Sequence, residues 1–269
     1  MKKVSAIFSV ILLTFFSCTK TEKQVSESST KSDSTKIVTN IFTIDSVKVD
    51  DSLKIDKNLT TAFKSKILVF PNISNKTLLD SVYSATNIKL DTYTKDHLLQ
   101  ELQKKQNDFY ENTKESLNDW KPDFKQTWDE TSSMKLFSTQ GNYMTIQYTG
   151  SGYTGGAHGY YNEIYKVFDV SNHKTIQISD LIINQDPKIW NRILMTNFLE
   201  NDLEKKQAEM LLVKEIPLNR NFYFDKDNLY FLYNQYEIAA YAAGPVLIKI
   251  PYTEIKPFLN PDFKAKMNL

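Results

Sequence analysis

The sequence has few of the residues on which many chemical functions depend. Of its 269 residues, one is cysteine, three are histidine, and only Arg192 and Arg220 are arginine. A single cysteine cannot form a disulfide within the chain, and no two histidines have the close spacing of a zinc motif. Arginine makes the bidentate contacts to phosphates and bases that nucleic-acid recognition favours. The two arginines and the net charge of +1 therefore argue against nucleic-acid binding. We therefore expect no metal, no cofactor and no nucleic-acid partner.

Glycine is also scarce, and its distribution is uneven. Six of the seven glycines lie between Gly141 and Gly159, and the seventh is Gly244. Glycine allows positive φ angles and close backbone approach. Strand-like runs at 142–148 and 160–170 flank most of these glycines. The pattern predicts an elaborate connection between two antiparallel strands.

Residues 1–17 have the pattern of a lipoprotein signal peptide. Lys2 and Lys3 precede a mainly apolar run, 4–16, that is too short for a permanent membrane span. The run leads to Ser17 and Cys18, which matches a lipobox in which Cys18 is the lipid attachment residue, although Phe15 stands where leucine is usual. An ordinary secretory signal with a chance cysteine is the alternative.

Residues 18–35 are rich in Ser, Thr, Lys and Glu, and they predict a flexible tether because they offer little apolar surface to bury. Acyl chains on Cys18 would hold the protein to a membrane. We therefore expect a lipid-anchored protein of the cell envelope that faces the periplasm or the cell surface.

The remainder predicts an α+β fold of antiparallel sheets with packed helices. We expect two adjoining subdomains that share an interface, an N-terminal one over 36–170 and a C-terminal one over 171–262. Asp186 and Pro187 mark the start of one helix, whose two apolar stripes indicate deep packing against a sheet. The other predicted helices are 76–86, 95–119 and 253–259. The predicted strands are 37–55, 60–70, 124–135, 136–148, 160–170, 175–178, 221–224, 229–233 and 246–250, the last of them central in its sheet.

No catalytic set is assembled by sequence spacing alone. His158 is the sharpest candidate, either as a ligand-contacting imidazole or as a ring that bonds nearby carbonyls and locks the turn. Carboxylate pairs that hydrolyse glycosides are defined by distance in space rather than in sequence. The possible members are Asp129, Glu130, Glu163 and Glu237, each of which could equally be a surface or structural acid.

Aromatic residues are concentrated in two places, beside the glycine-rich connection and in the segment 236–245. Alanines next to Gly244 permit close packing there, and exposed tyrosines could stack on sugar rings or anchor a protein partner. Core packing is the alternative use. We expect the two segments to lie close together in the fold. The candidate binding residues are Tyr153, His158, Tyr161, Tyr236, Glu237 and Tyr241.

These segments also carry a family resemblance. Thr154-Gly-Gly-Ala-His-Gly159, Tyr236-Glu-Ile-Ala-Ala-Tyr-Ala-Ala-Gly-Pro245 and Ile250-Pro-Tyr-Thr-Glu-Ile255 are similar to motifs of a bacterial extracytoplasmic family of paired domains of unknown function. Its members include the lysozyme-sensing anti-sigma factor RsiV and the non-catalytic region of the peptidoglycan deacetylase PdaC. Ala240 stands where the family usually has proline. The resemblance implies an α+β fold and a binding role in the envelope.

The leading hypothesis is a non-enzymatic binding lipoprotein of the cell envelope. Its ligand would be peptidoglycan or a cell-wall-acting protein such as lysozyme. One alternative is an enzyme acting on cell-wall glycan, with His158 and a carboxylate such as Glu237 brought together by folding. Another is a structural envelope protein in which Tyr153, Tyr161, Tyr236 and Tyr241 are all core residues.

Overall fold

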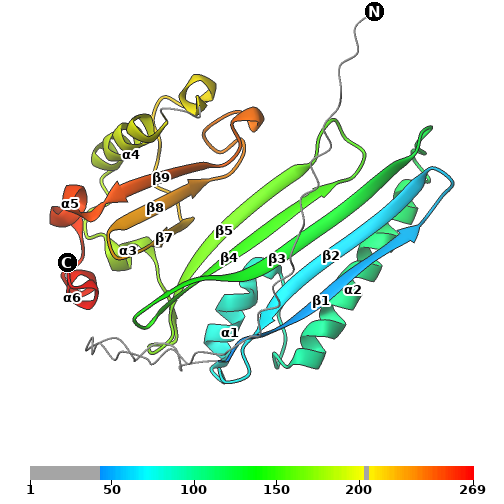
Figure 1. The fold of residues 1–269 in the computed structure, drawn as a ribbon, viewed down its shortest axis with the longest axis horizontal. Helices are drawn as coiled ribbons and strands as arrows, with labels where there is room; N and C mark the ends of the chain where they lie inside the picture. The colour runs from blue at the N-terminus through cyan, green and yellow to red at the C-terminus, as the bar shows by residue number, and fades with distance from the viewer. Residues whose placement is uncertain (1–42, 203–205) are drawn as a thin grey trace, which may run out of the picture. The chain divides into compact units, whose positions relative to one another are not determined.

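A computed structural model describes residues 43–202 and 206–269. The described residues form a mixed α and β structure with one six-stranded and one three-stranded sheet (Figure 1), which confirms the α+β class. The predicted signal peptide, the lipid attachment residue Cys18 and the tether 18–35 lie outside the described residues.

The larger sheet has strands in the spatial order in which they occur along the chain. Four of its five neighbouring pairs are antiparallel, but β2 and β3 are parallel. This pair departs from the expected antiparallel pairing, because a helical crossover joins the two strands and returns the chain to the end of the sheet at which β2 begins. The strands are β1 (Asp45–Lys54), β2 (Leu59–Val69), β3 (Gln126–Gln140), β4 (Tyr143–Tyr153), β5 (Tyr160–Asp169) and β6 (Lys174–Thr175).

The crossover consists of α1 (Lys76–Tyr83), the short helix η1 (Ser84–Thr86) and α2 (Lys95–Ser116), and both α-helices cover one face of the sheet (Figure 1). Each begins at a capping side chain. Asn75 accepts a hydrogen bond from the Leu78 amide, and Thr94 accepts one from the His97 amide, which satisfies amides that have no partner within the helix.

We call the chain after β6 the C-terminal part. It contains the smaller sheet, with strand order β7-β8-β9. The run at 246–250 was expected to be a central strand, and this is wrong because β8 is central and β9 lies at the edge. β9 buries only Val246, Ile248 and Ile250, whereas Leu247 and Lys249 are exposed. The strands are β7 (Phe222–Phe224), β8 (Asn228–Tyr233) and β9 (Val246–Pro251). The helices are α3 (Ile178–Leu181), α4 (Pro187–Asn201), η2 (Gln207–Met210), η3 (Tyr241–Ala243), α5 (Tyr252–Ile255), η4 (Lys256–Phe258) and α6 (Pro261–Met267).

The two faces of the large sheet contribute to two different hydrophobic cores. Met144, Ile146 and Phe168 pack beneath α1 and α2. Tyr143 and Val167 face the opposite way and join the core of the C-terminal part. The period-2 alternation of β4 and β5 therefore places one sheet between two cores.

Several boundaries differ from those expected from the sequence. β3 is one strand to Gln140, whereas the sequence analysis divided it after residue 135. The turn lies instead at Gly141, whose φ is 57°. β4 then continues through Gly150 and Gly152 to Tyr153, so the glycine-rich connection is shorter than predicted and spans only residues 154–159. The final predicted helix, 253–259, is α5 followed by η4, and α6 was not predicted.

Helix α4 starts as predicted, with Asp186 as its N-cap and Pro187 in its first turn. Only one of its two apolar stripes is fully buried. Trp190, Leu194 and Phe198 are buried, whereas Leu199 on the other stripe is 50% exposed. The expected burial of both stripes is therefore wrong for part of the helix.

Substitutions on this helix should show that one stripe contributes to stability through burial and that the exposed end of the other does not. We expect Leu194→Ala to lower the free energy of unfolding by about 2–5 kcal/mol, because it removes a fully buried side chain and leaves a cavity. Leu199→Ala, the matched control, should change it by less than about 0.5 kcal/mol. Urea denaturation followed by circular dichroism measures both, and equal losses would contradict the burial of a single stripe.

Candidate functional site

The connection between β4 and β5, residues 154–159, depends on glycine for close approach. Gly155 has a φ of 91°, and a Cβ atom added there would lie 2.7 Å from the Trp128 ring. A Cβ on Gly159 would lie 2.7 Å from the Gly152 carbonyl oxygen. Larger residues are therefore excluded at both positions, and the backbone fixes where His158 is displayed.

His158 lies against the segment that follows β8. Its ring stacks on the Tyr241 ring with centroids 4.1 Å apart, and the Tyr241 hydroxyl donates to the Gly159 carbonyl at 3.0 Å. The predicted proximity of the glycine connection and the segment 236–244 is confirmed. We call His158, Tyr236 and Tyr241 the aromatic cluster.

Hydrogen bonds determine the tautomer of neutral His158. Its Nδ1 lies 2.8 Å from the Gly159 carbonyl oxygen, which can only accept, so Nδ1 carries the proton. The other nitrogen, Nε2, lies 3.5 Å from the Tyr236 hydroxyl and can accept from it. The imidazole is thus oriented by its own loop and by the tyrosine of a distant turn.

Tyr236 is held at the surface by an unusual backbone conformation. Its φ is 67°, a value that is uncommon for a bulky residue and costs conformational energy. Its side chain is nonetheless 58% exposed, so core packing does not account for it. The adjacent Glu237 accepts from the Asn234 amide at 3.0 Å, so its carboxylate stabilises this turn. Among the described residues, no carboxylate is hydrogen-bonded to His158.

Two asparagine side chains bind the free edge of β5 next to the aromatic cluster. β6 pairs only with Phe168 and Asp169, which leaves the earlier part of this edge without a neighbouring strand. Asn234 accepts from the Glu163 amide at 2.8 Å and donates to the Glu163 carbonyl at 3.0 Å. Asn221 donates to the same carbonyl at 2.7 Å and accepts from the Tyr165 amide at 2.8 Å. These amides replace the missing strand and position the turn that carries Tyr236.

The Glu163 carboxylate lies in a hydrogen-bonded group on the same strand. It accepts from the hydroxyls of Tyr161 and Tyr165 and from the Gln147 amide. Burial and the hydrogen bond to Glu163 raise the pKa of Tyr161 to about 12, and both effects also raise the pKa of Tyr165. Since three donors occupy the carboxylate, Glu163 acts as a structural acid in this arrangement.

The structure divides the six predicted binding residues. His158, Tyr236 and Tyr241 come together, and Glu237 lies in the neighbouring turn. Tyr161 belongs instead to the Glu163 group, and Tyr153 packs near Leu59, Leu117 and Trp128. None of the four candidate tyrosines is fully buried, although the structural-protein alternative requires this.

Asn221 and Asn234 were missed by the sequence analysis. Asn221 is the first residue of the predicted strand 221–224, and Asn234 follows the predicted strand 229–233, where asparagine normally indicates a turn. Nothing in the spacing shows that their side-chain amides would bond a strand 56 to 71 residues away. No periodic signal identifies such a contact.

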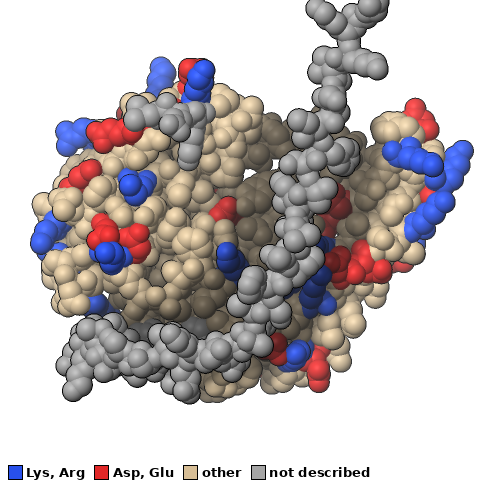
Figure 2. All heavy atoms as spheres, in the orientation of Figure 1, with Lys and Arg blue, Asp and Glu red and all other residues tan. Residues whose placement is uncertain are grey.

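The cluster offers exposed ring faces and a few oriented polar atoms. The described residues contain no group of three His, Cys, Asp or Glu side chains suited to a metal. Charges of both signs are interspersed on the face drawn in Figure 2, so that face offers no field of a single sign to attract a ligand. The arrangement is suited to stacking and hydrogen bonding.

Comparison with known proteins identifies a domain in the C-terminal part. Residues 177–253 match the family described as protein of unknown function, DUF3298. Tyr236 and Tyr241 lie within this match, whereas His158 precedes it. No curated protein matches the chain. In the part of the chain that is described, no helix has both the length and the apolar character to cross a membrane.

The solved structures that match this chain include two members of the DUF3298 family. A member of the DUF3298 family from Bacteroides fragilis NCTC 9343 has a TM-score of 0.70 and 18% identity, covering 84% of this chain and 97% of its own. A DUF3298 family protein from Pseudomonas aeruginosa PAO1 has a TM-score of 0.49 and 17% identity, covering 82% and 96% respectively. The first similarity shows a shared fold.

Removing the Asn234 side chain tests whether its hydrogen bonds to the Glu163 backbone stabilise the protein. In Asn234→Ala the Glu163 amide loses its partner, whereas the Glu163 carbonyl keeps Asn221. We expect the free energy of unfolding to fall by about 1–3 kcal/mol and the Glu163 amide to exchange faster with deuterium. Asn191→Ala is the control because its amide bonds Glu215 at an exposed site. Unchanged exchange at Glu163 would contradict this role.

Proposed function

Because residues 177–253 match the DUF3298 family and the signal-like N-terminus ends at a cysteine, we propose that this protein is an envelope-anchored lipoprotein with a non-enzymatic binding function. Its ligand is peptidoglycan or a cell-wall-acting protein such as lysozyme. The observation that carries the proposal is the aromatic cluster, in which Tyr236 is exposed in a strained backbone conformation and backed by His158 and Tyr241.

The geometry of the cluster supports recognition by stacking. The Tyr236 ring centroid is 5.9 Å from that of Tyr241 and 6.4 Å from that of His158. Such rings combine an apolar face with a polar tip, which suits both sugar rings and the buried centre of a protein interface. Because the loop and the turn fix the rings before binding, little side-chain entropy is lost when a ligand binds.

The contacts favour binding over the alternative of an enzyme acting on cell-wall glycan. The enzyme alternative pairs His158 with a carboxylate, whereas its polar partners among the described residues are the Gly159 carbonyl and the Tyr236 hydroxyl. Glu237, the carboxylate suggested for this role, bonds the Asn234 amide instead. Glu163 already accepts three hydrogen bonds.

The anchoring part of the proposal depends on the sequence of residues 1–35. The basic start, the short apolar run and Ser17 before Cys18 match a lipoprotein signal. The polar segment 18–35 would separate the binding domain from the membrane. The resemblance to the extracytoplasmic family of RsiV and PdaC supports the same compartment.

Mass spectrometry tests the anchor directly. We expect the mature protein, expressed in a bacterial host that processes lipoproteins, to begin at Cys18 and to carry acyl chains, which make it partition into detergent. Cys18→Ser should remain uncleaved at this site or lack lipid. A mature wild-type protein with an unmodified thiol at Cys18, or with a different cleavage site, would disprove the lipid anchor while leaving the binding function open.

Sedimentation with purified sacculi and pull-down with immobilised lysozyme test the ligand. We expect the mature protein, kept in detergent, to bind one of the two. Tyr236→Ala should weaken that binding roughly tenfold or more, because a truncated aromatic anchor costs about 2 kcal/mol or more at an interface.

Ile183→Ala is the matched control, since Ile183 is 62% exposed and lies outside the cluster. It should bind like the wild-type protein. Failure of the wild-type protein to bind either material would remove both ligand classes. Equal binding by wild type and Tyr236→Ala would show that the aromatic cluster is not the contact surface.

A further inference from the structure

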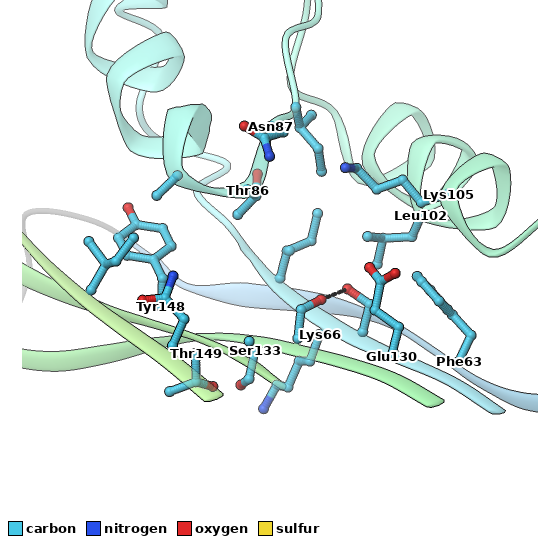
Figure 3. A pocket seen from close by; sticks show the side chains of 18 residues that line it. Phe63, Lys66, Thr86, Asn87, Leu102, Lys105, Glu130, Ser133, Tyr148 and Thr149 are labelled. Atoms are coloured by element: carbon cyan, nitrogen blue, oxygen red, sulfur yellow. Dashed lines mark hydrogen bonds between the residues drawn. The ribbon is translucent and has the colours of Figure 1, made fainter. Parts of the chain in front are cut away.

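A cavity of about 180 Å³ lies on the helix-covered face of the large sheet (Figure 3). It opens between η1 with the two residues that follow it on one side and α2 on the other. None of the aromatic-cluster residues lines it. Since one water occupies roughly 30 Å³ of liquid, the space is about six waters in size, which suits a small metabolite better than a polymer.

The cavity arises from a row of small residues across three strands. Ser65 on β2 pairs with Ser132 on β3, which pairs with Gly150 on β4. Bulky side chains flank this row on both sides, among them Phe63 and Tyr148. A Cβ atom added to Gly150 would have no atom within 4 Å. The hollow is therefore specified by the sequence at these three positions.

Two opposite charges point into the hollow. Glu130 rises from β3, and Lys105 extends from α2 above it (Figure 3). Both side chains are half-buried, and burial raises the pKa of the Glu130 carboxyl while the nearby Lys105 opposes that effect. Among the described residues, neither the Glu130 carboxylate nor the Lys105 ammonium has a hydrogen-bond or ion-pair partner. Partly buried charges without partners are costly, and a ligand can remove that cost.

We propose that this cavity binds a small zwitterion of amino-acid size. Its ammonium group pairs with Glu130 and its carboxylate with Lys105. A simple cation would bring a like charge to Lys105, and a simple anion would bring one to Glu130. A molecule with both charges complements the pair.

The remaining lining determines what the body of the ligand contacts. The Ser65 and Ser132 hydroxyls are 2.8 Å apart, so one hydroxyl hydrogen is left to donate. Leu102 and Ile164 supply apolar walls, while Asn87 lies at the rim (Figure 3). A short aliphatic or polar side chain would fit between these groups. The proposal does not depend on the envelope-binding function, because the two sites share no residue.

Calorimetric titration of the mature protein with individual amino acids tests this site. The probes are the common L-amino acids together with D-alanine and D-glutamate. We expect at least one to bind saturably, and its N-acetyl and C-amide derivatives to bind at least roughly tenfold more weakly, because each loses one charge-assisted contact.

Three substitutions locate the binding. Glu130→Gln and Lys105→Met should each weaken it roughly tenfold or more, and Gly150→Leu should abolish it by filling the cavity. The matched controls are Lys104→Met and Asp108→Asn, two exposed residues of the same helix, which should leave affinity unchanged. If Gly150→Leu fails to fold, the nearly isosteric Glu130→Gln still provides the test.

Absence of binding for every amino acid at millimolar concentration would overturn the proposal. So would undiminished affinity in folded Gly150→Leu or in Glu130→Gln, since the ligand would then lie elsewhere. Sacculus and lysozyme binding by these cavity variants should equal that of the wild-type protein. Loss of amino-acid binding therefore reports on the cavity alone, and loss of sacculus or lysozyme binding reports on the aromatic cluster alone.

Discussion

The arrangement around the aromatic cluster depends on the contact between two asparagine amides and the exposed edge of β5. Asn221 and Asn234 together satisfy the amide and carbonyl of Glu163 and the amide of Tyr165. Backbone groups at a strand edge otherwise need another strand or water. By supplying the hydrogen bonds from side chains, the C-terminal part attaches to the large sheet and leaves the Tyr236 turn free to project beside His158.

This attachment explains why one sheet can support two separate sites. Alternation along β4 and β5 sends one set of side chains toward α1 and α2 and the other toward the C-terminal core. The cavity with Glu130 and Lys105 lies on the helix side, and the aromatic cluster forms where the β4–β5 connection meets the segment after β8. Large residues fill most of the helix side, and the cavity opens where Ser65, Ser132 and Gly150 replace them.

Much of the fold could be predicted because its signals are local. Asp186 and Pro187 located the start of α4, and strand-like runs at 221–224 and 229–233 located β7 and β8. The parallel β2–β3 pair could not be predicted from period-2 alternation, which is identical in parallel and antiparallel strands. The pairing of Tyr236 and Tyr241 with His158 was expected, whereas the asparagine contacts and the unpaired Glu130 result from tertiary packing that leaves no periodic trace in the sequence.

The parallel pairing of β2 with β3 has a consequence for how the chain reaches its folded state. β1 and β2 form a local hairpin, but β3 can join β2 only after the whole α1–α2 crossover has been made and folded back. The loop-closure entropy of that long connection must be offset before the middle of the sheet exists. Until then the inner edge of β2 has unpaired backbone groups that a strand of another chain could bind.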